Sequence, residues 1–235
     1  MNNQILNSIA IIGGGPAALM ILKHILKQSV QPKNIYIFEK NERFGAGMPY
    51  GKLGSQKEHV ANVSANELPE LVDTFKQYLK ENPSSDFKDF NPYQVIPRLL
   101  LGDYLENQFK QYIELAKKEG IKVFAKNKTM VTDISKLEGK DQFKITTNQS
   151  EKIIADKVII CTGHVWPKMQ EEKIKGWFDS PYPPSKFKET SNFPVAIRGT
   201  SLTAIDAVKT IARLNGKFIE TDNGHIKYQL NKNSE

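Results

Sequence analysis

The sequence predicts an α/β fold built around a parallel β-sheet. A short isoleucine-rich run over residues 8–12 leads into the glycine turn 13–15, which is followed by an amphipathic helix over 17–28. A second apolar run covers residues 35–39, and a third, over 157–161, stops just before another glycine. Apolar runs of this length are typical of strands buried on both faces, and their alternation with helices predicts parallel pairing.

The first strand, helix and second strand have the length of a βαβ unit, about 30 residues. Pro16 stands at the start of the helix, where the first turn accepts proline. The elements expected next are an irregular glycine-rich segment over 40–66, helices over 68–81 and 98–119, and strands over 121–125, 130–137, 143–147, 152–155 and 157–161. The short strands before the last one predict a β-meander crossover, and therefore a Rossmann-like, three-layer arrangement.

A proline-rich connection then separates these elements from a second strand–turn–helix unit. This unit is expected to contain a strand over 194–198, a glycine turn and a helix over 202–214. A hairpin with strands over 217–221 and 225–230 follows.

Composition limits the classes of function. The 235 residues carry a formal net charge of +7, but the lysines are scattered, so we expect no nucleic-acid partner. The single cysteine, Cys161, excludes an internal disulfide. There is no apolar stretch of membrane-spanning length and the N-terminus does not resemble a secretory signal, so we expect a cytoplasmic protein without a membrane partner.

The turn after the first strand has the pattern Gly13-x-Gly15-x-x-Ala18 of a dinucleotide site. Gly13 permits a tight turn, Gly15 lets the backbone approach a pyrophosphate, and Ala18 lets helix and strand pack closely. The free N–H groups of the helix N-terminus favour the phosphates. Glu39, at the end of the second strand, can accept both hydroxyl protons of an adenosine ribose and would repel a 2′-phosphate.

The residues after Glu39 favour FAD over NAD as the dinucleotide. Residues 39–51 (EKNERFGAGMPYG) resemble the segment after the ribose acid in two-dinucleotide flavoproteins of the FAD/NAD(P)-binding fold. The sequence is most similar to the group containing FAD-dependent amino-acid N-hydroxylases and related uncharacterised FAD/NAD(P)-binding proteins. Further matching motifs are HVANV at 59–63, PR at 97–98, GDYL at 102–105, ICTGH at 160–164, PYPP at 181–184 and GTSLTAID at 199–206.

The resemblance implies roles for individual residues in binding FAD. Those expected at the FAD site are Gly13, Gly15 and Ala18 at the pyrophosphate, Glu39 at the ribose, Val131 at the adenine, Thr162 and Gly163 in a turn over the cofactor, and Asn62 near the flavin ring. Pro16 and Lys40 are also expected among the residues that bind FAD. For Val131, Thr162, Gly163 and Asn62, turn formation or core packing is an equal alternative.

The second glycine turn resembles an NAD(P) fingerprint, which places Gly199, Ser201 and Thr203 at a nicotinamide dinucleotide. Ser201 stands where a glycine is usual, and its side chain would crowd a pyrophosphate, so we expect weak binding there. Members of the group continue well beyond this length. We therefore expect an FAD-binding domain over 1–192 and the incomplete beginning of an NAD(P)-type unit over 193–235.

We therefore expect the protein to be an FAD-dependent oxidoreductase. It would be a monooxygenase or oxidase that acts on a small-molecule substrate and takes its electrons from NAD(P)H. The alternative is a dinucleotide-binding sensor or scaffold without turnover. The four histidines lack the spacing of metal ligands, so no metal site is expected. The sequence assigns no catalytic side chain and leaves a homo-oligomer open.

Overall fold

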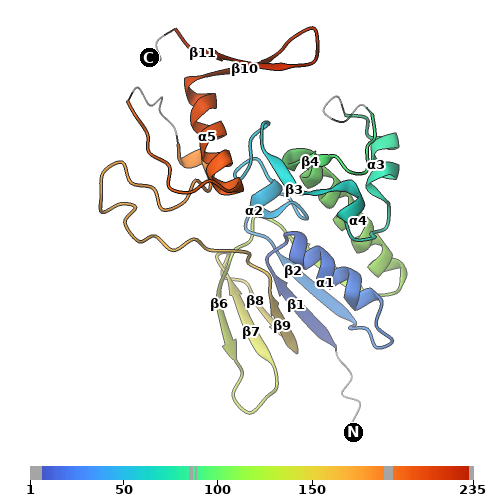
Figure 1. Cartoon of the computed structure of the whole chain (residues 1–235). Coiled ribbons are helices and arrows are strands. Elements are labelled where there is room, and N and C mark those ends of the chain that lie inside the picture. The colour runs from blue at the N-terminus through green and yellow to red at the C-terminus, as the bar shows by residue number, and fades with distance from the viewer. Residues whose placement is uncertain (1–6, 85–86, 88, 188–192, 233–235) are drawn as a thin grey trace.

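The computed structural model of the protein describes residues 7–84, 87, 89–187 and 193–232. Three layers form its main body (Figure 1): a parallel sheet lies between a pair of helices and a small antiparallel sheet. This confirms the α/β, Rossmann-like architecture that the sequence predicts.

The central sheet has the order β5-β2-β1-β9, and its strands pair in parallel. Its members are β1 (Ser8–Ile12), β2 (Asn34–Phe38), β5 (Lys122–Lys126) and β9 (Lys157–Ile160). In β1, Ile9 and Ile11 join the core on the helical side, whereas Ala10 and Ile12 join the core on the other side. The two-residue period of a strand therefore explains why β1 is apolar throughout.

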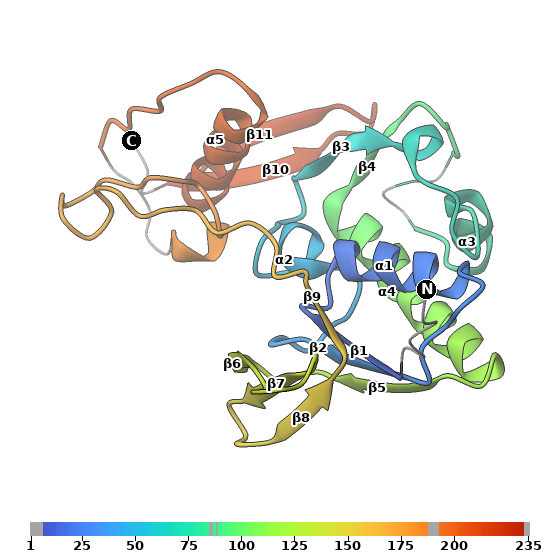
Figure 2. The ribbon, with the colours of Figure 1, turned by 90° about the horizontal axis from the view of Figure 1, so that it is seen from below.

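Two helices cover one face of the sheet, as both views show (Figure 2). The helix α1 (Pro16–Leu26) follows the glycine turn, and α4 (Arg98–Lys118) packs beside it. The buried stripe of α4 runs through Leu101, Leu105, Phe109 and Ala116, at the spacing of an amphipathic helix.

The other face of the sheet is covered by the β-meander β6 (Val131–Lys136), β7 (Phe143–Thr147) and β8 (Lys152–Ala155). Ile145 and Ala155 are fully buried against Phe38 and the inner residues of β1. The predicted crossover is therefore present, and it supplies the third layer.

The segment between β2 and α4 contains α2 (Gly47–Tyr50), β3 (Val60–Ser64), η1 (Ala65–Glu67), α3 (Phe75–Glu81) and β4 (Val95–Pro97), and β3 pairs with β4. The predicted helix over 68–81 is wrong in its first half. Leu68 precedes Pro69, which disfavours helical backbone, and the helix begins only after Thr74. Thr74 and Gln77 form a reciprocal capping box there.

Beyond β9 the chain runs through an irregular segment, with η3 (Pro184–Lys186), to the helix α5 (Leu202–Asn215) and the hairpin β10 (Gly216–Glu220) and β11 (Ile226–Leu230). In Figure 1, α5 and the hairpin are drawn in orange to red, on the side of α2 that is away from the central sheet. The predicted strand over 194–198 is wrong, because these described residues form no strand. A strand needs backbone partners, and none of the described sheets includes these residues. The expected domain boundary, 192/193, adjoins residues 188–192, which are outside the described part.

Candidate dinucleotide site

The turn between β1 and α1 is held tightly against the neighbouring strands. Gly13 has a φ of +100° and donates from its N–H to the carbonyl oxygen of Phe38, at 2.8 Å. A Cβ at this position would lie 2.3 Å from the carbonyl oxygen of Cys161. Only glycine therefore combines this backbone conformation with so close an approach to the end of β9.

The acid at the end of β2 is bound to the same turn. Glu39 is 5% exposed, and its Oε2 accepts a hydrogen bond of 2.8 Å from the N–H of Gly14. Its Oε1 accepts hydrogen bonds from the backbone N–H and the side-chain amide of Asn41, at 2.8 and 2.9 Å. A carboxylate has about four acceptor positions. Because Oε1 is already used twice, one position remains at Oε2, and a second ribose hydroxyl would have to replace the amide of Asn41.

The N-terminus of α1 offers backbone donors beside this acid. Gly15 is the N-cap, Pro16 is the first helical residue, and Ala18 is fully buried, which confirms that the helix begins where the motif predicts. The geometry of a helix leaves the N–H groups of its first turn, including those of Ala17 and Ala18, without an intrahelical carbonyl. A Cβ on Gly15 would meet only the backbone of Gly47, at 3.3 Å. Free N–H groups at a helix N-terminus, next to a residue without a side chain, suit a pyrophosphate.

Three of the other predicted residues lie at strand ends around this turn. Lys40 directly follows Glu39 and is exposed. Thr162 follows β9, and its backbone nitrogen would lie 3.1 Å from a Cβ on Gly13. The predicted turn at Thr162 and Gly163 therefore adjoins the glycine turn 13–15. Gly163 has a φ of +78°, with open space in front of it.

Val131 and Asn62 differ in how they relate to the turn. Val131 begins β6 and packs with Phe38 against the meander core, beside a register shift in the pairing with β7. Asn62 is exposed in β3. The strand β3 packs against β4 and α4. No described contact joins Asn62 to the glycine turn.

The second predicted site has a less enclosed geometry. Gly199 has a φ of +112°, and Ser201 is the N-cap of α5 without a side-chain capping bond. Thr203 follows in the first turn of the helix, and all three residues are exposed. The turn and helix are present as predicted, but the strand that should precede them is not.

Sequence reasoning missed the residues that hold the loop 40–54 in place. A Cβ on Gly45 would lie 2.4 Å from the carbonyl oxygen of Leu105, and one on Gly102 would lie 2.1 Å from that of Tyr50. Arg43 in the same loop pairs with Asp103 at 2.5 Å and with Glu106. The signal in the sequence was Gly102, a glycine inside a helix, which indicates close approach of another backbone.

Cys161 lies against the glycine turn but is a poor nucleophile. Burial raises the pKa of its thiol, so the thiol remains protonated at neutral pH. The carbonyl oxygen of Cys161 faces Gly13, and its N–H donates to Ile12 at 2.7 Å. Its contribution is therefore to the geometry of the turn.

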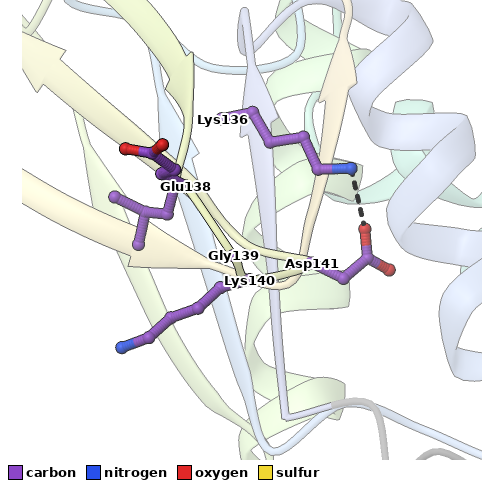
Figure 3. A pocket seen from close by; sticks show the side chains of 6 residues that line it. Lys136, Glu138, Gly139, Lys140 and Asp141 are labelled. Carbon is purple, nitrogen blue, oxygen red and sulfur yellow. Dashed lines mark ion pairs between the residues drawn. The ribbon is translucent and has the colours of Figure 1, made fainter.

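Two hollows of the surface lie away from this site. One of about 550 Å³ is formed by the β6–β7 turn, residues 136–141, where Lys136 pairs with Asp141 at 3.5 Å (Figure 3). Lys140 points away from that pair. The other, of about 470 Å³, lies between α3 and the residues after it, including Phe87 and Phe90. Neither includes a residue of the two glycine turns.

Within the described ranges, no group of three or more His, Cys, Asp or Glu side chains could hold a metal ion. The same part of the chain contains no helix with the length and apolar character needed to cross a membrane.

Comparisons with known proteins identify the family and the fold. Residues 10–165 match the FAD-NAD(P)-binding family. In an alignment 240 residues long, the chain is 32% identical to the uncharacterized protein YdhS of Escherichia coli K12. The match covers 98% of this chain and 44% of the relative. The monooxygenase PC-14 of Penicillium crustosum is 26% identical, in a match that covers 84% of this chain and 32% of that protein. The chain thus spans less than half the length of these relatives.

Solved structures share the fold. The closed crystal structure of cyclohexanone monooxygenase superposes with a TM-score of 0.56 at 16% identity, covering 89% of this chain and 36% of that one. The open crystal structure of cyclohexanone monooxygenase gives the same TM-score at 17% identity. At this level of identity the likeness concerns the arrangement of strands and helices.

Proposed function

Because the chain belongs to the FAD-NAD(P)-binding family, we propose that it carries the FAD site of an NAD(P)H-linked oxidoreductase that acts on a small substrate. The observation that carries this is the hydrogen bond between Gly14 and Glu39, which joins the phosphate-binding turn to the ribose acid at the carboxyl end of the parallel sheet. Relatives named as monooxygenases favour monooxygenation over simple oxidation.

The residues present suit FAD. Gly13 permits the tight turn against the end of β9, and Gly15 leaves room for the pyrophosphate. The N–H groups after Pro16 would face the pyrophosphate, and Ala18 keeps the helix close to the sheet. Glu39 would accept a ribose hydroxyl at Oε2. When bound, FAD supplies the redox chemistry by passing electrons from a nicotinamide to oxygen. The chain itself contributes binding, orientation and a fixed electrostatic environment.

The remaining predicted residues have supporting roles in this proposal. The backbone of Val131 would meet the adenine, Thr162 and Gly163 would close over the cofactor beside Gly13, and Lys40 would add positive charge beside the ribose. Asn62 would face the flavin from β3. Gly199, Ser201 and Thr203 would receive the pyrophosphate of NAD(P)H at the start of α5.

The test is to load the purified chain with FAD, add NADPH without oxygen, and then admit oxygen. The proposal predicts a yellow protein that NADPH bleaches and oxygen restores. Gly15→Val is the control that should not retain flavin, since a Cβ at Gly15 would meet only Gly47, at 3.3 Å. A protein that retains FAD but is bleached by dithionite and not by NADPH would contradict the reductase part and favour a binding protein without turnover. A chain that retains no FAD would contradict the proposal as a whole.

A further inference from the structure

A buried carboxylate of α5 connects three distant segments of the chain. Asp206 is 4% exposed, and its Oδ2 lies 2.6 Å from Nη2 of Arg98, the first residue of α4. The hydroxyl of Tyr182, from the segment between β9 and α5, donates to the same oxygen. Arg98 also donates from Nη1 to that hydroxyl at 3.4 Å, and its guanidinium lies 5.9 Å from the ring centre of Tyr182. These three residues are called the Asp206 junction below.

The protonation states in the junction are mutually consistent. Burial, followed by the hydrogen bond to Asp206, raises the pKa of Tyr182, so its hydroxyl keeps the proton that it donates. Burial alone would lower the pKa of Arg98, but the contacts with Tyr182 and Asp206 raise it overall. The junction is therefore a charged pair with one neutral donor, and the carboxylate is compensated by both partners.

One turn further along α5, Thr210 contacts a buried histidine from another part of the chain, His59. His59 is fully buried and precedes β3; its Nε2 lies 3.2 Å from the hydroxyl of Thr210. That hydroxyl donates its proton to the carbonyl oxygen of Asp206 at 2.8 Å, so Nε2 must be the donor. Nδ1 accepts from the N–H of Gln56 at 3.2 Å. Both ring nitrogens are thus satisfied by a neutral imidazole.

Directional polar contacts, more than apolar packing, fix α5 in place. On its outer side Leu202, Ile205 and Val208 are 54%, 45% and 53% exposed. Its inner side places only Asp206, Thr210 and Asn215 among the buried residues. A buried ion pair gives little net stability, because desolvation offsets the attraction, but its geometry can fix one arrangement over others.

We propose that Arg98, Tyr182 and Asp206 are positioning residues that set the second glycine turn, 199–203, relative to the FAD turn, and so align the nicotinamide with the flavin. Asp206 lies five residues after Ser201 on the same rigid helix, so any rotation of α5 about the junction moves that turn. The proposal rests on the proposed function for its second part, that the turn receives NAD(P)H.

The first measurement is amide hydrogen exchange over α5 in the FAD-loaded chain. Tyr182→Phe removes one hydroxyl and is the mild variant; Asp206→Asn removes the charge. Both should raise exchange in α5 by about tenfold or more, with α1 and β1 unchanged. Lys117→Gln is the control, since it removes an exposed ion pair with Glu114 on the helix that carries Arg98. Unchanged protection of α5 in Tyr182→Phe and in Asp206→Asn would overturn the proposal.

The second measurement is the rate of flavin bleaching by NADPH without oxygen, extrapolated to saturating NADPH. In Tyr182→Phe the limiting rate should fall by about tenfold, with the apparent NADPH Kd and the FAD Kd within about threefold of the wild type. Equal limiting rates would overturn the alignment role. If NADPH does not bleach the wild-type flavin, the proposed reductant is wrong, and hydrogen exchange still decides whether the junction fixes α5.

Discussion

The carboxylate of Glu39 accepts a hydrogen bond of 2.8 Å from the backbone N–H of Gly14, although 25 positions separate the two residues. The bond joins the end of β2 to the turn that opens α1, so Glu39 and the glycine turn are held together as one unit. This relationship explains why the glycine pattern and the acid occur together, and it leads to predictions that separate folding from binding.

Two neighbouring glycines should respond differently to alanine. A Cβ on Gly14 would lie 2.5 Å from Cδ1 of Phe44 and 2.9 Å from Cβ of Glu39. We therefore expect Gly14→Ala to destabilise the fold by about 1–3 kcal/mol through overpacking. A Cβ on Gly15 would meet only Gly47 at 3.3 Å, so Gly15→Ala should keep a Tm close to the wild type while weakening FAD by about tenfold, or 1.4 kcal/mol. Thermal unfolding and FAD titration would test the pair, and equal Tm values for the two variants would contradict it.

Glu39→Ala should weaken FAD and ADP but not FMN, because only the first two carry an adenosine ribose. The lost charged hydrogen bond should cost about 1.5–3 kcal/mol, which corresponds to about tenfold or more in affinity. Glu42→Ala is the matched control, since Glu42 is exposed and pairs with Lys128 at 2.9 Å. Calorimetry that finds the same FAD affinity in Glu39→Ala and in the wild type would rule out the ribose role.

Stability should fall as the pH is lowered through the range in which His59 titrates. Burial lowers the pKa of His59 below its usual 6.5; the charges of Asp206 and Glu58 oppose the shift, and that of Arg98 adds to it. The unfolded chain therefore binds more protons than the folded one between the two pKa values. This part of the stability is complete above about pH 6.5 and is lost as the pH falls toward the folded-state pKa.

Urea unfolding at about pH 7.5 and about pH 5.5 measures this dependence. His59→Gln should reduce the difference between the two pH values, whereas His225→Gln, in the exposed turn of the hairpin, should leave it as in the wild type. The same pH dependence in all three proteins would show that His59 does not carry the effect.

Ser201→Gly should tighten NADPH binding by only a few fold. The side chain of Ser201 makes no capping bond and is exposed, so it can turn partly away from an incoming pyrophosphate. FAD affinity should stay unchanged, because the first turn is separate. Titration with NADPH in the presence of FAD measures both quantities, and a gain of about a hundredfold, or 2.7 kcal/mol, would mean that Ser201 blocks the site outright.

Most of the fold was predictable because local patterns and tertiary structure agree in the first unit. The alternating burial of Ile9, Ala10 and Ile11 requires apolar residues on both faces of β1, and that requirement is visible as an isoleucine-rich run. The glycine turn and its helix could be located because Gly13 needs a positive φ and Pro16 suits the first helical position. The match to the FAD-NAD(P)-binding family confirms the predicted family.

The wrong predictions concern segments whose structure depends on contacts with distant residues, and a local sequence pattern does not show those contacts. Residues 194–198 are apolar enough for a strand, but they pair with none of the described strands. The amphipathic pattern over 68–81 predicted one continuous helix, whereas the helix begins only after its N-cap, Thr74. In the site, the use of Oε1 of Glu39 by Asn41 depends on the local turn of the backbone, and the Asp206 junction joins residues far apart in the chain.

The FAD site that we propose consists of the turn 13–18 and Glu39. Its most direct test is a titration of the purified chain with FAD, followed by flavin fluorescence, with ADP and FMN as competitors. We expect saturable binding of FAD that ADP displaces at much lower concentration than FMN does, and that is lost in Gly15→Val. Displacement by FMN but not by ADP would contradict it, since the adenosine half would then lie outside the site.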